Sequence, residues 1–190
     1  MLSQRIQQHF IDSADLKYQC AQTLAAPVEA AVHAVLACVT GGGKLLACGH
    51  GGSAAAARAL AGHFVGLFER ERPGLPALAL HGDDASPLAR QVRALGDAGD
   101  VLLLLAPAGL PEPLAEAVHA AHEREMTVVA LCGARGGTLG PLLKDTDVLV
   151  AVPHERLARI LEVHHLVLHC ICDGVDAQLL GDGAEPETDA

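Results

Sequence analysis

The most chemically informative stretch of the sequence is a glycine loop that follows an apolar run. Residues 45–48 are Leu-Leu-Ala-Cys, and the Gly-His-Gly-Gly-Ser loop at 49–53 leads into an alanine-rich segment. Glycines allow a tight turn and bring backbone N–H groups close to a ligand, and a helix N-terminus adds donors and partial positive charge. We therefore predict that Gly51, Gly52 and Ser53 bind a phosphate group, with Ser53 at the N-cap position of the helix.

Two other phosphate-binding motifs fit this loop less well. A Walker A loop requires Gly-Lys-Ser/Thr at its end, and the loop lacks this tripeptide. A dinucleotide fingerprint (G-x-G-x-x-A) requires an acidic residue roughly 20 residues further on. The acids at the end of the next apolar run, Asp83 and Asp84, stand more than 30 residues after the loop. The third interpretation is a loop that binds a sugar phosphate.

The elements that must position this loop follow from the apolar pattern. Five short runs are continuously apolar, as in parallel strands that are covered on both faces. These runs are 44–48, 76–81, 100–106, 126–132 and 146–152. Helices are predicted at 3–24, 27–40, 53–68, 112–124 and 154–180. The alternation of strands and helices predicts an α/β three-layer sandwich, a five-stranded parallel sheet flanked by helices.

The length and composition set further limits. The 190 residues fit one domain over 1–180, with N-terminal helices in 1–42, a C-terminal helix over 154–180 and an acidic tail over 181–190. A net charge of -10 and an aromatic content of 2% disfavour direct binding of nucleic acid or of an anionic membrane. The six cysteines form no Cys-x-x-Cys motif, and the chain starts without a secretory signal. We expect buried free thiols and a cytoplasmic protein.

Several segments together resemble the sugar isomerase (SIS) domain family. The loop at 49–53 is similar to the family's Gly-Asn-Gly-Gly-Ser/Thr-Ser loop, and residues 70–80 resemble its Arg-Pro-x-x-Pro-Ala-Ile-Ala segment. Segments 99–103, 126–131 and 152–164 also match, in the same order. The chain is identified as similar to the branch that holds phosphoheptose isomerases and DnaA initiator-associating proteins. The resemblance implies a five-stranded parallel sheet and a homotetramer.

The resemblance also implies two catalytic positions. Isomerisation of an aldose–ketose pair requires a base that moves a proton beside a carbonyl group and an acid for the oxygen. In the isomerases, a Glu on the helix after the glycine loop and a His on the last helix fill these roles. His164 matches this His, and His63 stands at the Glu position. His164 is alternatively a packed histidine. The imidazoles of His63 and His164 together are the one candidate zinc site, and no other metal or cofactor is expected.

The second phosphate-binding element of the family has lost its hydroxyl groups in this chain. Its Ser-Thr-Ser/Arg-Gly-Asn-Ser pattern aligns with residues 106–111, Ala-Pro-Ala-Gly-Leu-Pro, in which the two prolines also lack an N–H group. Each missing charge-assisted hydrogen bond to a phosphate forfeits about 1.5–3 kcal/mol. We therefore expect weakened binding of sugar phosphates at this site.

Other residues favour the initiator-associating proteins within the branch. Ser13 and the segment 91–100 resemble those proteins, and Leu179 and Leu180 occupy positions that the resemblance assigns to partner binding, or alternatively to helix-end packing. We expect a non-catalytic homotetrameric scaffold that binds a replication initiator without touching DNA. The alternatives are a phosphoheptose isomerase that acts on sedoheptulose 7-phosphate and a regulatory module that senses a sugar derivative.

Overall fold

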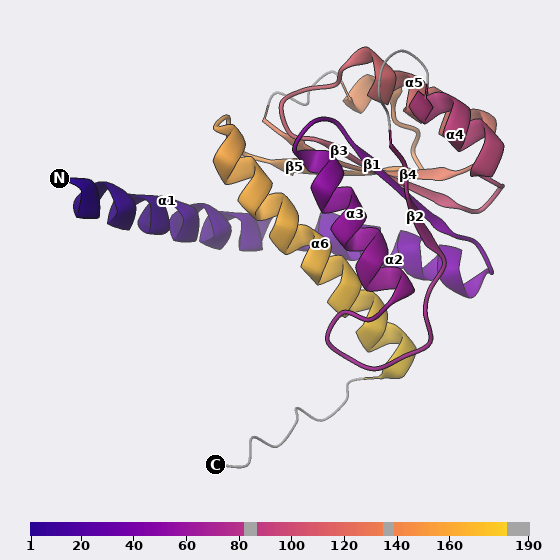
Figure 1. The fold of residues 1–190 in the computed structure, drawn as a ribbon, viewed down its shortest axis with the longest axis horizontal. Coiled ribbons are helices and arrows are strands. Elements are labelled where there is room, and N and C mark those ends of the chain that lie inside the picture. Colours follow the sequence, from indigo (N-terminus) through magenta and orange to yellow (C-terminus); the bar gives the residue numbers. More distant parts are fainter. Residues whose placement is uncertain (82–86, 135–138, 182–190) are drawn as a thin grey trace.

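The strands of the computed structural model form one parallel sheet. The structure describes residues 1–81, 87–134 and 139–181. The strand order is β2-β1-β3-β4-β5, and every neighbouring pair is parallel (Figure 1). The strands are β1 (Leu45–Gly49), β2 (Ala77–Ala79), β3 (Val101–Ala106), β4 (Thr127–Gly133) and β5 (Val148–Val152). The predicted α/β fold with a five-stranded parallel sheet is confirmed.

The helices cover both faces of this sheet (Figure 1). They are α1 (Leu2–Thr23), α2 (Ala25–Thr40), α3 (Ser53–Val65), α4 (Pro87–Leu95), α5 (Glu112–Glu123) and α6 (Leu157–Leu180), with a short 3-10 helix, η2 (Gly140–Leu142). The sequence did not predict α4, because nine residues are too few to establish a helical period. Helix α6 begins three residues later than expected, since the backbone N–H of Arg156 bonds Nδ1 of His154 and forms a turn there.

Two apolar cores explain why the strands are apolar without alternation. Leu45 and Ala47 of β1 face a core built with α1, α2, α3 and α6, whereas Leu46 and Cys48 face a second core built with α4 and α5. All residues of β1 and β3 are buried. A strand that is covered on both faces has no position at which a polar side chain would be solvated.

Helix α1 extends away from the rest of the molecule (Figure 1). Its contacts with α6 include a hydrogen bond of 2.6 Å from the Ser13 hydroxyl to the Glu162 carboxylate and a bond from Arg159 to the His9 carbonyl. Among the described residues, no single helix has the length and apolar character to cross a membrane, although α1 and α2, bent by 69° at their junction, pass that criterion as a pair.

Some predicted features lie outside the described residues. Asp83 and Asp84, the acids considered for a dinucleotide site, are among them, as is the predicted acidic tail beyond Gly181.

Candidate functional site

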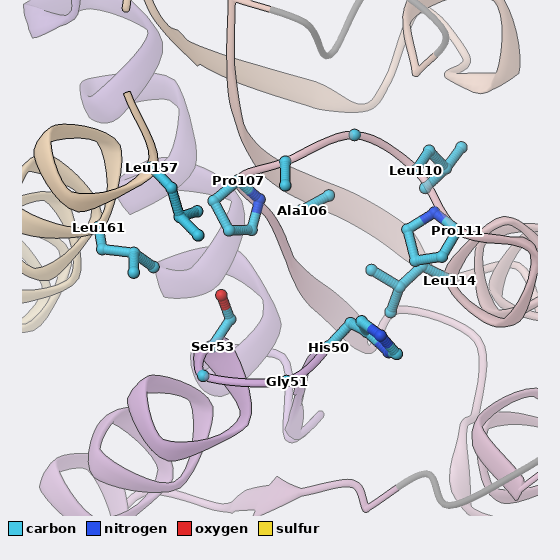
Figure 2. A pocket seen from close by; sticks show the side chains of 13 residues that line it. His50, Gly51, Ser53, Ala106, Pro107, Leu110, Pro111, Leu114, Leu157 and Leu161 are labelled. Carbon is cyan, nitrogen blue, oxygen red and sulfur yellow. The ribbon is translucent and has the colours of Figure 1, made fainter. Parts of the chain in front are cut away.

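A pocket of about 540 Å³ lies where β1 and β3 end. The chain leaves β1 for α3 on one face of the sheet and leaves β3 for α5 on the other. Ligands of open α/β sheets bind at such a switch point, beyond the carboxyl ends of the strands. The lining residues come from both loops and from the start of α6 (Figure 2): His50, Gly51, Gly52, Ser53, Ala106, Pro107, Ala108, Gly109, Leu110, Pro111, Leu114, Leu157 and Leu161.

The glycine loop forms one wall of this pocket. A Cβ atom on Gly49 would lie 2.8 Å from backbone and side-chain atoms of Ser53, so only glycine allows the loop to fold back this closely. Gly51 has a φ of 58°, which favours glycine as well. The N–H groups of Gly51 and Gly52 have no acceptor within the described part of the chain. They are free donors at the N-terminal end of α3, as phosphate binding requires.

Ser53 adds a hydroxyl group to the same wall. Only 1% of the residue is exposed, and Oγ has no hydrogen-bond partner among the described residues. Figure 2 shows this oxygen pointing from the loop toward Pro107 and Leu161. The prediction that Ser53 is the N-cap is wrong: Gly52 is the N-cap, Ser53 is the first helical residue, and no side chain caps α3. The hydroxyl is therefore buried beside the pocket without a partner among the described residues.

The opposite wall is apolar in its side chains but keeps backbone donors. Residues 106–111 present no hydroxyl group to the pocket. The N–H groups of Ala108 and Leu110, however, have no acceptor among the residues described, while Gly109, at a φ of 118°, donates to the Ala106 carbonyl over 3.4 Å. Glu112 stands in the first turn of α5, directly after this wall. The sequence pattern revealed the lost hydroxyls and missed the free amides.

His164 lies one turn beyond Leu161 on the same face of α6 and does not line the pocket. The residue is 1% exposed, and its Nε2 lies 3.2 Å from the Cys132 carbonyl at the end of β4. Since a carbonyl only accepts, Nε2 carries the proton and Nδ1 has a free lone pair, with no partner in the described structure. Burial lowers the pKa of His164 to about 4, so the imidazole is neutral at pH 7.

The structure does not bring His63 and His164 together. His63 lies near the far end of α3, about 15 Å along the helix from Ser53 at 1.5 Å per residue. Its ring packs edge-on against Phe68, with 5.2 Å between centroids, and lies 6.0 Å from His169 of α6. No group of three or more His, Cys, Asp or Glu side chains within the described ranges is placed to hold a metal ion.

Leu179 and Leu180 lie at the exposed end of α6, while the pocket adjoins its first turns. Their assignment to partner binding remains a prediction. His50 is a residue whose importance the sequence analysis missed. It is the single ionisable side chain among the described residues that line the pocket. The signal was its place inside the glycine loop, directly before the free N–H groups of Gly51 and Gly52.

The parallel sheet and the glycine loop at its switch point define a class of α/β proteins. A SIS domain model matches residues 8–133, and the chain belongs to the SIS domain family. Within that family it lies in the phosphoheptose isomerase branch. It is 56% identical to the phosphoheptose isomerase of Methylibium petroleiphilum, over 96% of this chain and 97% of that protein.

Solved structures agree with this assignment. The phosphoheptose isomerase of Neisseria gonorrhoeae superposes with a TM-score of 0.85 at 41% identity, covering 93% of this chain and all of that one. The phosphoheptose isomerase of Francisella tularensis gives a TM-score of 0.87 at 36% identity, covering 93% of this chain and 98% of the other. The predicted family and fold are both confirmed.

These relatives contradict the expectation of a non-catalytic scaffold for a replication initiator. Proteins that are 43–56% identical over nearly the whole chain are named phosphoheptose isomerases. The expectation gave decisive weight to the hydroxyls missing from 106–111. The structure shows why that weight was too large: Ser53 and four backbone N–H groups around the pocket still offer hydrogen bonds to an anion.

Proposed function

We propose that the protein interconverts an aldose and a ketose that carry a phosphate group, as a phosphoheptose isomerase acting on sedoheptulose 7-phosphate. The observation that carries the proposal is the buried, unpartnered Ser53 hydroxyl beside the free N–H groups of Gly51 and Gly52, in a pocket at the switch point of the sheet. The similarity to phosphoheptose isomerases over nearly the full chain supports the choice of substrate.

The phosphate would bind the glycine loop. Three donors converge there, two N–H groups and one hydroxyl, and the N-terminal end of α3 adds partial positive charge. The N–H groups of Ala108 and Leu110 lie on the opposite side and replace part of what the missing hydroxyls would supply. Both walls then contribute to binding, although the second contributes only through its backbone.

We retain His164 as a candidate for proton transfer, because the family resemblance assigns that role to its position. Its free Nδ1 lone pair supports the assignment. Its depressed pKa makes it a weak proton acceptor at neutral pH, where general bases work best with a pKa near the working pH. His63 remains a candidate by sequence position only, since its ring contacts Phe68 and His169 outside the pocket.

The direct test is turnover of sedoheptulose 7-phosphate, followed by NMR as the aldoheptose 7-phosphate appears. The proposal expects turnover by the purified protein and a higher KM in Ser53→Ala. Ser13→Ala is the matched control, because Ser13 bonds Glu162 outside the pocket and its loss leaves KM unchanged. Tight binding of the sugar phosphate without turnover would instead indicate a sensor. The absence of both binding and turnover would refute the proposal.

We also propose self-association, with the homotetramer as the expected form. Helix α1 exposes large apolar side chains that a monomer would leave in water: Leu2, Ile6, Phe10, Ile11 and Tyr18. Multi-angle light scattering of the purified protein measures the assembly. A monomer at micromolar concentration would contradict this part of the proposal.

A reducing, cytoplasmic setting is our proposal for the compartment. All six cysteines are free and five of them are buried. Burial raises the pKa of Cys48 and of Cys172 to about 12, so these thiols stay protonated and unreactive. Thiol titration of the native protein should therefore detect mainly the exposed Cys170. Rapid reaction of more than one thiol would contradict this assignment.

A further inference from the structure

The apolar part of the pocket extends beyond the loop at 106–111 onto helix α6. Leu157 and Leu161 of α6 line the same cavity as Pro107, and we call these three residues the leucine patch. Figure 2 shows the two leucines beside Pro107, on the side toward which the Ser53 oxygen points. Leu157 is 47% exposed, so the patch is in contact with water in the empty protein. Covering such a surface with the carbon atoms of a ligand is favourable.

A fully hydroxylated sugar suits the leucine patch poorly. The side chains of Pro107, Leu157 and Leu161 neither donate nor accept a hydrogen bond. A sugar hydroxyl that is pressed against them loses its water partners and gains no others, which lowers affinity by a factor of roughly 5–150. An aliphatic group in the same place loses no hydrogen bond, because it makes none in water. The patch therefore favours carbon over hydroxyl groups in the part of the ligand that it contacts.

The cavity has room for such a group beside the phosphate. Its volume of about 540 Å³ falls in the range of roughly 300–1,000 Å³ that is usual for pockets of drug-sized ligands. Three donors gather on the glycine loop, namely the N–H groups of Gly51 and Gly52 and the buried hydroxyl of Ser53. A ligand that uses both the loop and the patch carries an anionic group and an aliphatic group.

We propose that the pocket binds a phosphorylated sugar that carries a short aliphatic substituent, with its phosphate on the glycine loop and the substituent on the leucine patch. The inference rests on the proposed function for the phosphate site and goes beyond it in the class of ligand. Such a compound competes with the heptose phosphate for the same loop. The inference depends on residues that every chain of the proposed homotetramer contains, so groups added by a partner chain do not remove its basis.

The test is a calorimetric titration of the purified, assembled protein with methyl, ethyl, propyl and butyl glucoside 6-phosphates. These compounds carry the phosphate and the alkyl chain at opposite ends of one sugar. A glycoside has no free carbonyl group to isomerise, so binding is measured without turnover. We expect Kd to fall about threefold to fourfold for each added CH₂ group, which corresponds to about 0.8 kcal/mol per buried CH₂. Butyl glucoside without phosphate should bind at least about tenfold more weakly than its 6-phosphate.

Leu157→Asn tests the leucine patch itself, because asparagine is close to leucine in size and replaces its methyl groups by polar atoms. In this variant the gain in affinity from methyl to butyl should fall below about threefold, while the Kd of the methyl compound changes less than about threefold. Leu95→Asn is the matched control. Leu95 of α4 is 41% exposed, similar to Leu157, and does not line the pocket, so this variant should keep the full dependence on chain length.

Two results would overturn the inference. One is a Kd that changes less than about twofold from methyl to butyl, or no binding of any of the four compounds. This result is also expected if a partner chain covers Leu157 in the assembly. The other is an equal dependence on chain length in Leu157→Asn and Leu95→Asn, because the alkyl chain would then lie elsewhere.

Turnover of sedoheptulose 7-phosphate, measured on the same preparation, separates this inference from the proposed function. A flat alkyl series together with turnover overturns the inference and leaves the proposed isomerase standing. A steep series without turnover supports the inference and refutes the isomerase.

Discussion

Replacing Ser53 by alanine should make the empty protein more stable and the ligand-bound protein less stable. In the empty pocket the Ser53 hydroxyl is buried and has no partner among the described residues, and an unsatisfied buried hydroxyl costs about 1–3 kcal/mol. The hydroxyl caps no backbone group of α3, so its loss does not weaken the helix. We expect Ser53→Ala to raise the free energy of unfolding by about 1 kcal/mol, equivalent to roughly 2–4 °C in Tm for a chain of this size.

A bound sugar phosphate should reverse this order. At a ligand concentration of about 100 times Kd, binding stabilises the wild-type protein by about 2.7 kcal/mol. Loss of one charge-assisted hydrogen bond of about 1.5–3 kcal/mol weakens binding by a factor of roughly 10–150. For a factor near 100, the same ligand concentration stabilises Ser53→Ala by only about 0.4 kcal/mol. The expected result is a crossing: the variant melts higher without ligand and lower with it.

Thermal unfolding with and without sedoheptulose 7-phosphate measures both effects. Ser13→Ala is the control, since it loses a hydrogen bond of 2.6 Å to Glu162 and should be destabilised by about 1 kcal/mol with an unchanged ligand shift. The reasoning is refuted if Ser53→Ala melts lower than wild type without ligand and keeps the full ligand shift. That result would mean that the hydroxyl stabilises the empty protein and does not contact the phosphate.

Three further outcomes are expected. The pKa of buried His164 lies at about 4 in the folded protein, against roughly 6.5 in the unfolded chain. The free energy of unfolding should therefore fall by about 3 kcal/mol as pH falls from 6.5 toward 4, because only the unfolded chain gains the proton in that range. Urea unfolding of His164→Gln should lack this pH dependence. The side chains of Arg72 and Asp176 form a buried ion pair, each only 2% exposed. Arg72→Met leaves the Asp176 carboxylate unpaired and should lower the free energy of unfolding by about 3–5 kcal/mol, whereas the double variant Arg72→Met/Asp176→Leu should regain most of it. Ala108→Ser restores a hydroxyl to the apolar wall and should lower KM up to about tenfold; an unchanged KM would show that this wall does not touch the phosphate.

The sequence by itself determined the layers of the fold and the place of the glycine loop. Continuous apolar runs predict strands that are buried on both faces, and the structure buries every residue of β1 and β3. The glycine pattern at 49–53 predicted a tight turn before a helix, and the steric contact between Gly49 and Ser53 shows the physical need for it. These features are local, so the type and order of neighbouring residues determine them.

Tertiary structure decided which groups meet in the pocket. The sequence pattern paired His63 with His164, but helix geometry places His63 beside Phe68 and buries His164 against the Cys132 carbonyl. The free backbone donors of Ala108 and Leu110 were invisible, because a backbone N–H group is available only where the folded chain offers it no acceptor. Burial, hydrogen-bond partners and distances across the sheet depend on contacts between segments that are far apart in sequence. The composition and spacing of neighbouring residues do not determine those contacts.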